Sequence, residues 1–331
     1  MFNYTKLLFL VMTILSTLII LSSNSWLGMW MGMEMNLISF IPFMSKIKNK
    51  KSSQSMIIYF MTQSMGSVIF LFSILMNKFI MISPIMMDQF IQEILITSML
   101  LKLGAAPFHS WMPEMMSNMN WIEILILSTW QKVGPMIVLN SIMMNSWIIK
   151  VSVIMSTIIG AIGGIMFTSM RKILAYSSIN HMSWMIMMMD LKSQWYSYLM
   201  IYSMLMTMTC IWFYKNNIFF MNQTMMNSTL MEKLTISMLM LSLGGMPPLL
   251  GFLPKWMVIQ ALMTKGMIMI MMIMIMMSML TLFYYMRMIS LFLLMFSTMN
   301  KWNFKNKNEM LMFLVLITNM MLPLFSIMSF L

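Results

Sequence analysis

Apolar runs of roughly 20 residues, the length that crosses a bilayer as an α-helix, recur along this whole chain and restrict the folds open to it. Of its 331 residues, 60% are hydrophobic and only 8% are charged. A soluble globular domain carries about 25% charged residues. We therefore expect an all-α, polytopic membrane protein with no soluble domain of useful size between the spans.

The apolar runs predict eleven membrane-spanning helices, and glycine and proline break the fourth and the ninth. The expected spans are about 4–22, 26–43, 56–76, 88–116, 121–144, 148–168, 173–189, 195–214, 233–263, 267–292 and 310–329.

Most basic residues lie in loops that follow even-numbered spans, whereas loops after odd-numbered spans hold at most one basic residue each. The loop after the fourth span departs from this pattern because it holds Glu114. Basic loops stay on the inner side of a membrane, so we predict an inner N terminus and an outer C terminus. The net charge of +12 is then a topology signal, and we expect no nucleic-acid partner. The basic residues of the even-numbered loops are Lys46, Lys48, Lys50, Lys51, Arg171, Lys172, Lys215, Lys233, Lys301, Lys305 and Lys307.

The stretch LLKLGAAPFHSWMPE, residues 100–114, places Lys102 inside an apolar run. Gly104 and Pro107 then interrupt the helix, and His109 follows the interruption. A charge inside a membrane helix is costly and usually marks an ion or proton path. A broken helix at membrane depth is tolerated where protein or a water-filled cavity surrounds it. Both signals together indicate a transport site.

A short internal repeat links the two broken spans. Residues 101–107 align with residues 241–247, with identical residues at four of the seven positions. Because the copies lie five spans apart, we expect them to cross the membrane in opposite directions, as in inverted-repeat transporters. We predict a single membrane domain, 1–331, with a first repeat half at 1–145, a second at 146–295, and a C-terminal loop with the last span at 296–331.

Three further charged residues lie deep in predicted spans: Glu34, Lys132 and Lys255. For Glu34, the structural alternative is a carboxyl near the interface or one kept protonated by burial. The functional interpretation pairs it with Lys102, directly or through a short water bridge, because an unpaired buried charge is costly. Lysine suits proton transfer because desolvation favours its neutral form and a nearby carboxylate favours its charged form.

His109 and His181 can relay protons near neutral pH, although a purely structural role is a serious alternative for both. The chain has one cysteine, Cys210, so it cannot supply a disulfide or a usual iron–sulfur site. Two separated histidines do not favour a haem site. We therefore expect no metal and no bound cofactor in this chain.

Five segments lie in order along residues 31–256: MGMEMNLISFIP, LLKLGAAPFHSWMPE, STWQKVGP, RKILAYSSINHMSW and LSLGGMPPLLGFLPKW. Together they resemble the chain 2 family of mitochondrial NADH–ubiquinone oxidoreductase, or respiratory complex I. The high methionine and asparagine content is similar to that of insect-type mitochondrial sequences, and 60 residues are methionine.

The resemblance implies an antiporter-like, proton-translocating subunit of the mitochondrial inner membrane, with its N terminus in the matrix. Glu34 and Lys102 would form a carboxylate–lysine pair, Lys132 the central lysine, His181 a linker and Lys255 the lysine of the second broken helix. It also implies that this chain lacks three N-terminal helices of bacterial members. The loss leaves a surface for other subunits to cover.

The resemblance places redox chemistry outside this chain, which acts as a subunit of the oxidoreductase without a redox centre. The complex as a whole uses NADH, FMN, iron–sulfur clusters and ubiquinone. The implied partners are neighbouring antiporter-like subunits, small carboxylate-bearing subunits of the membrane arm, and lipids.

Two other functions fit the residues alone. A stand-alone cation/proton antiporter would transport without partner subunits. A structural subunit would keep its buried charges as relics, and neutralising them would leave pumping unchanged.

Overall fold

The computed structural model describes residues 4–45, 50–77, 84–142, 146–224, 230–294 and 315–320. These ranges are almost wholly α-helical, which confirms the all-α prediction. Their only β-type pairing is an isolated bridge between Ser169 and Phe220. The helices are α1 Tyr4–Ser22, α2 Trp26–Met44, α3 Lys50–Asn77, α4 Pro84–Leu103, α5 Trp111–Asn118, α6 Trp121–Ser128, α7 Trp130–Ile142, α8 Trp147–Ile165, α9 Met170–Asp190, α10 Trp195–Asn216, α11 Leu230–Gly244, α12 Phe252–Thr264 and α13 Ile268–Leu294, with a 3₁₀ helix at Met221–Thr224.

Each of the first ten predicted spans coincides with one helix or with a pair of helices. Among the described residues, six segments are long and apolar enough to cross a membrane. The loop prediction was wrong for the basic residues that the structure describes, because they lie in the end turns of helices. They are Lys50 and Lys51 of α3, Arg171 and Lys172 of α9, Lys215 of α10 and Lys233 of α11. Lysine is a good helix former, so α3 continues beyond its apolar run. The predicted eleventh span lies outside the described residues except for 315–320.

The predicted fifth span is divided into α6 and α7 at Thr129. Pro135 lies inside α7, and a proline removes one backbone hydrogen bond and pushes against the carbonyl four residues earlier. At the division, the Thr129 amide and hydroxyl both donate to the Leu125 carbonyl, at 3.1 and 2.6 Å. The sequence did not predict this interruption.

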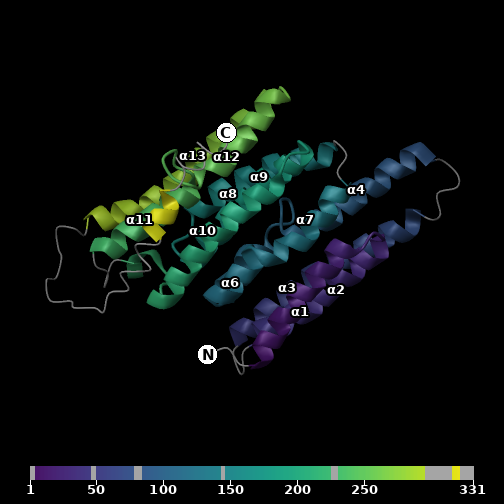
Figure 1. The fold of residues 1–331 in the computed structure, drawn as a ribbon, viewed down its shortest axis with the longest axis horizontal. Coiled ribbons are helices and arrows are strands. Elements are labelled where there is room, and N and C mark those ends of the chain that lie inside the picture. Colours follow the sequence, from purple (N-terminus) through teal and green to yellow (C-terminus); the bar gives the residue numbers. More distant parts are fainter. Residues whose placement is uncertain are drawn as a thin grey trace. The chain divides into compact units, whose positions relative to one another are not determined.

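The chain forms two compact units, residues 1–156 and 157–331. In the first unit α1, α2 and α3 lie side by side (Figure 1). Helix α7 packs against α1, α2 and α4. Its inner position buries Gln131 and Lys132.

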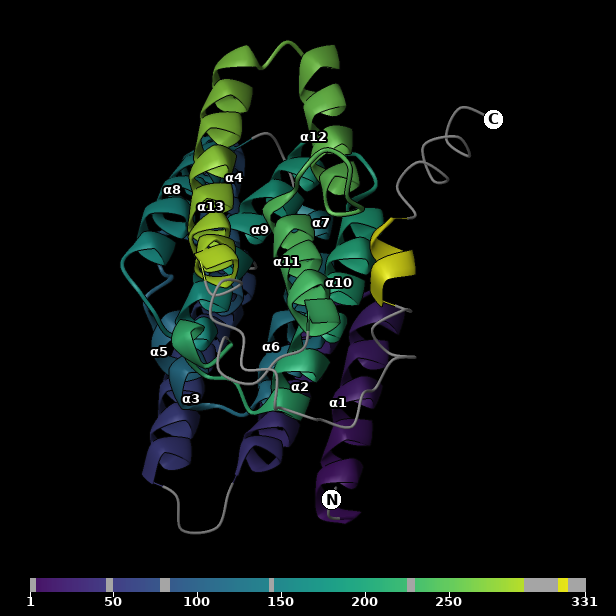
Figure 2. The ribbon, with the colours of Figure 1, turned by 90° about the vertical axis from the view of Figure 1, so that its left-hand side faces the viewer.

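In the second unit α9 packs against α10, α12 and α13, while α11 and α13 lie side by side (Figure 2). Nearly every residue of α9 from Ile173 to Asp190 is buried, although the helix is rich in polar residues. Its serine hydroxyls bond back to carbonyls one turn earlier, as Ser183 does to Asn180 at 2.6 Å. This bonding lets a polar helix lie inside the bundle without unmet donors on its serines.

Both predicted helix breaks are present, and they share one backbone geometry. Gly104 and Gly245 have φ values of +69° and +80°, a region that favours glycine. The amide of Ala105 bonds to Leu100 at 3.0 Å, and the amide of Met246 bonds to Leu241 at 3.1 Å. Each is the six-to-one bond of a Schellman helix end.

These bonds correct the predicted alignment of the repeat by one residue. Gly104 is equivalent to Gly245, not to Gly244, because the bond patterns before and after each break match only in that register. The second half-helices then start at equivalent positions, Trp111 and Phe252. In this register Glu114 of the first broken helix is equivalent to Lys255 of the second. The two copies therefore share their backbone geometry but not their charged residues.

Candidate functional site

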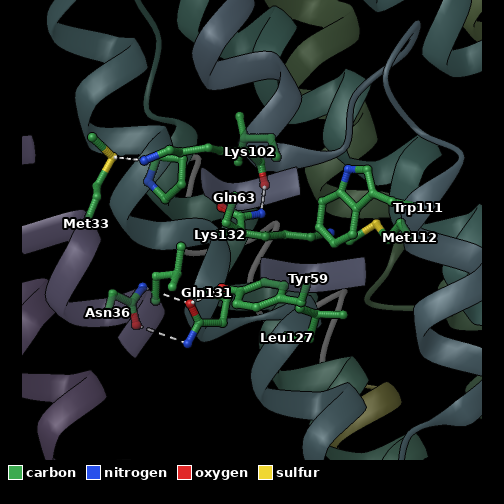
Figure 3. Close-up of a pocket in the computed structure, with 13 residues that line it drawn as sticks. Met33, Asn36, Tyr59, Gln63, Lys102, Trp111, Met112, Leu127, Gln131 and Lys132 are labelled. Atoms are coloured by element: carbon green, nitrogen blue, oxygen red, sulfur yellow. Dashed lines mark hydrogen bonds between the residues drawn. The ribbon is translucent and has the colours of Figure 1, made fainter. Parts of the chain in front are cut away.

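A small, partly open cavity in the first unit brings together two of the predicted lysines, Lys102 and Lys132 (Figure 3). Its volume is about 20 Å³, enough for at least one water molecule. Amide, hydroxyl and ammonium groups line the cavity together with apolar side chains. The lining residues are Met33, Asn36, Leu37, Tyr59, Gln63, Lys102, Leu103, Trp111, Met112, Leu127, Gln131, Lys132 and Pro135.

Lys102 lies in the last turn of α4, directly before the break, and only 6% of it is exposed. Its ammonium donates to the Met33 sulfur at 3.7 Å. The Gln63 amide donates to the Lys102 carbonyl at 3.0 Å and so satisfies an acceptor that the helix end leaves open. The lysine stem passes over Gly66 of α3, where an added Cβ would lie 2.7 Å from Lys102 Cγ.

Glu34 follows Met33 on α2 and interacts electrostatically with Lys102. Its Oε1 is buried and accepts no hydrogen bond from the described residues. No carboxylate–ammonium contact within 4.0 Å joins Glu34 to a described lysine or arginine. The predicted pair is therefore not a direct ion pair, and a water bridge between the two groups stays a prediction.

Lys132 enters the cavity from α7 and is 3% exposed. In Figure 3 its side chain extends toward Trp111 and Met112, whereas Lys102 points the opposite way, toward Met33. Trp111 and Met112 open α5, the half-helix that follows the break. Both sides of the broken helix thus contribute to one cavity, Lys102 from before the break and α5 from after it.

A buried amide pair lies beside the lysines. Asn36 Nδ2 donates to Gln131 Oε1 at 2.7 Å, and Gln131 Nε2 donates back to Asn36 Oδ1 at 3.1 Å. The Tyr59 hydroxyl also donates to Gln131 Oε1, at 3.3 Å. Asn36, Tyr59 and Gln63 were not predicted from the sequence as site residues. The available signal was their polarity inside otherwise apolar helices.

Lys255 lies in the first turn of α12 in the second unit and is 3% exposed. Its ammonium donates to the Gly244 carbonyl at 2.6 Å. Gly244 ends α11, and the C-terminal end of a helix attracts a cation. The Trp184 ring lies 5.9 Å from the same ammonium, within cation–π range. No described carboxylate lies within 4.0 Å of Lys255.

His181 lies on α9, three residues before Trp184, so the two side chains share one face of the helix. The Tyr198 hydroxyl is 2.9 Å from His181 Nδ1, and the Tyr202 ring packs 4.9 Å from the imidazole. The second unit thus gathers His181 and Lys255 around α9, through Trp184.

The structure does not bring His109 to the cavity. It lies between α4 and α5, partly exposed, with Nδ1 donating to the Pro107 carbonyl at 3.2 Å. Within the described ranges, no cluster of three histidine, cysteine or acidic residues could hold a metal ion. Cys210 is a buried free thiol in α10.

Residues 23–281 match the membrane-protein family described as NADH:quinone oxidoreductase/Mrp antiporter, TM. The chain is 42% identical to NADH-ubiquinone oxidoreductase chain 2 of Anopheles gambiae over 307 residues, 90% of this chain and 89% of that relative. The Aedes aegypti protein of the same name is 45% identical over 307 residues, with the same shares.

A chain of the respiratory complex I from Thermus thermophilus has the same fold, with a TM-score of 0.81 at 17% identity. The match covers 96% of this chain and 76% of that one. The family resemblance predicted from the five motifs is confirmed by the insect relatives, which align along nearly their whole length. This chain belongs to the NADH-ubiquinone oxidoreductase chain 2 family, within the wider NADH:quinone oxidoreductase/Mrp antiporter family of membrane proteins.

Proposed function

We propose that this chain is the proton-translocating, antiporter-like subunit 2 of NADH:ubiquinone oxidoreductase in the mitochondrial inner membrane. It moves protons through buried lysine, glutamate and histidine side chains. The observation that carries the proposal is the cavity that holds Lys102 and Lys132 together inside an apolar bundle. Buried lysines are costly in a membrane helix and are rarely kept without a function.

The cavity supports proton transfer between the two lysines. Their ammonium groups point to opposite sides of it (Figure 3), so a transfer needs an intermediate carrier. A water molecule fits the volume of about 20 Å³. Water that bridges two polar groups is enthalpically almost as good as a direct hydrogen bond. A proton can therefore pass from one lysine to water and on to the other without direct contact.

In this proposal Glu34 regulates the proton affinity of Lys102. Its carboxylate acts on Lys102 without a direct contact, so a change of charge outside this chain can strengthen or weaken the interaction. Moving one charge against the membrane potential costs about 2.3 kcal/mol per 100 mV. A change in proton affinity of a few pKa units, at about 1.4 kcal/mol per unit, is of the required size.

In this proposal His181 and Lys255 carry the proton onward in the second half. Lys102, Lys132, His181 and Lys255 then form the proposed polar axis near the membrane midplane. The local support is that His181 and Lys255 gather around α9. His109 lies on the break but outside the cavity, so a role for it requires access from the surface. NADH oxidation, FMN, the iron–sulfur clusters and ubiquinone belong to other subunits, and neighbouring membrane-arm subunits transmit the charge change.

The test uses the complete complex in sealed vesicles, with proton uptake and NADH oxidation measured together. We expect Lys102→Met and Glu34→Gln to lower proton pumping and coupled turnover while the assembled complex persists. The control is Lys265→Met, because Lys265 is exposed after α12 and has the same charge. Normal pumping by Lys102→Met and Glu34→Gln would refute the proposal. Transport by the isolated chain without its partners would instead support a stand-alone antiporter.

A further inference from the structure

The second unit contains a cluster of buried tyrosines that the proposed path does not use. The four rings belong to Tyr198 and Tyr202 of α10 and to Tyr284 and Tyr285 of α13, and none is more than 2% exposed. Tyrosine in a membrane helix is usually found at the interface with water. Four buried phenols in one unit therefore call for a reason beyond packing.

Tyr198 and Tyr202 connect the cluster to His181. The Tyr198 hydroxyl lies 2.9 Å from Nδ1 of His181, and the Tyr202 ring packs at 4.9 Å from the imidazole. A phenol hydroxyl can donate to a neutral imidazole and accept from a charged one. Tyr198 can therefore keep its hydrogen bond to Nδ1 in both protonation states of the imidazole, by donating to the neutral ring and accepting from the charged one.

Tyr284 and Tyr285 extend the cluster to α13, with ring centroids 4.6 Å apart. Tyr284 interacts electrostatically with Tyr202, and Tyr285 interacts with Ser177 of α9. The two α13 hydroxyls are fully buried but do not reach the geometry of a full hydrogen bond with a described residue. A buried hydroxyl without a good partner is unfavourable, so bridging water is the expected partner.

Two glycines of helix α8 leave space for side chains of α9 and α13 to pack closely against it. A Cβ on Gly164 would lie 2.6 Å from the Tyr284 ring, and a Cβ on Gly160 would lie 2.9 Å from Cβ of Asn180. The two glycines are four residues apart, so they occupy one face of α8. Asn180 precedes His181 on α9, and its Oδ1 is buried without a hydrogen bond in the described part of the chain. The Tyr284 ring of α13 and Asn180 of α9 thus pack against the same face of α8.

We propose that these tyrosine hydroxyls, with bridging water, form a proton relay that serves His181. Tyr198 positions the imidazole and exchanges a proton with Nδ1, while Tyr202, Tyr284 and Tyr285 continue the relay toward α13. At each step a hydroxyl gives one proton to its neighbour and regains one from the group behind it. No bond other than O–H or N–H changes, and no oxidant or reductant is consumed.

The relay rests on the proposed function and adds residues to it. Phenol suits the role because its ordinary pKa of about 10 keeps it uncharged at neutral pH. A chain of neutral hydroxyls costs far less in a membrane than further charged groups.

The test replaces Tyr198 and Tyr284 separately with phenylalanine in the assembled complex, which keeps the rings and removes the hydroxyls. We expect NADH-driven proton pumping to fall by about fivefold, the factor that corresponds to one hydrogen bond of ordinary strength. The ratio of pumping rates in H₂O and D₂O should rise, because proton transfer becomes more rate-limiting. A merely structural role would leave that ratio unchanged. The control is Tyr196→Phe, since Tyr196 lies on α10 and is 55% exposed.

Pumping rates and isotope ratios equal to those of Tyr196→Phe would overturn the relay. If Tyr284→Phe prevents assembly, Tyr285→Phe replaces it as the second variant, with the same expected and contradicting results. Lys132→Met in the same assay separates the two proposals. If that variant fails to pump while the tyrosine variants pump normally, only the relay is wrong. If Lys132→Met pumps normally, the proposed function itself fails.

Discussion

Asn36 and Gln131 illustrate how single residues keep polar groups in an apolar bundle beside two lysines. Each amide satisfies the other through reciprocal hydrogen bonds of 2.7 and 3.1 Å. Such pairs are stabilising only while both partners are present, because a lone buried amide keeps its desolvation cost. The pair therefore fixes α2 against α7, and α7 carries Lys132.

Gln131→Leu should destabilise the complex by about 1–3 kcal/mol, because Asn36 is left buried without its partner. The double variant Asn36→Leu with Gln131→Leu should recover most of this loss, because both ends are then apolar. Thermal denaturation of the purified complex measures both effects. A double variant whose loss equals the sum of the two single losses would show that the amides act independently.

The sequence located the charged residues of the site but not their neutral neighbours. Lys102 and Lys132 stand out because a charge in an apolar run is rare. Asn36, Tyr59 and Gln63 are neutral, and such residues are frequent in membrane helices for many reasons. The partners Asn36 and Gln131 are 95 positions apart, and no local pattern connects them. The sequence predicted that Glu34 interacts with Lys102. Only the structure shows that their charged groups do not come within 4.0 Å of each other.

At the scale of helices, the two breaks are set by glycines with positive φ. The sequence predicted both breaks from glycine and proline, because these residues interrupt helices wherever they fall. The predicted alignment of the repeat was shifted by one residue. Residue identities match Gly104 with Gly244, whereas the positive φ and the hydrogen bonds match Gly104 with Gly245. The division at Thr129 was also not predicted, since a proline deep in a helix predicts a kink without fixing its position.

Gly245→Ala should harm both stability and transport. The left-handed backbone costs roughly 1–2 kcal/mol for a non-glycine residue, and the new Cβ would lie 2.7 Å from the Lys255 ammonium. The matched control is Gly266→Ala, because Gly266 has a φ of +69° with nothing within 4 Å of its Cβ position. We expect both variants to lower the denaturation temperature, and only Gly245→Ala to slow pumping as well. Equal pumping by the two variants would show that the Lys255 environment is not sensitive to this contact.

At the scale of the whole molecule, the loop charges predict how the chain crosses the membrane. The basic residues gather between each even-numbered predicted span and the next span, which predicts an N terminus in the matrix and, with eleven spans, a C terminus in the intermembrane space. Protease protection of tags on each terminus in intact mitoplasts tests this arrangement. Accessibility of both termini from the same side would exclude eleven spans.

The helices at the first ten predicted spans could be located closely because apolar length is a strong signal for a membrane helix. The least apolar of them, α9, is the one that the second unit encloses. Its polarity fits an interior helix that carries His181, whereas a lipid-facing helix would be apolar. The repeat halves at 1–145 and 146–295 and the single polar axis stay predictions.

The most direct test of the account is the number of protons translocated per NADH oxidised by the complex with Lys132→Met. Lys132 is buried in the cavity, and methionine keeps its length while removing the exchangeable proton. Proton transfer by a positioned side chain contributes about 10²–10⁴-fold to a rate, so we expect pumping through this subunit to cease. The measured ratio should then fall below that of Lys265→Met in a fully assembled complex. An unchanged ratio, with normal assembly and normal NADH oxidation, would contradict the account.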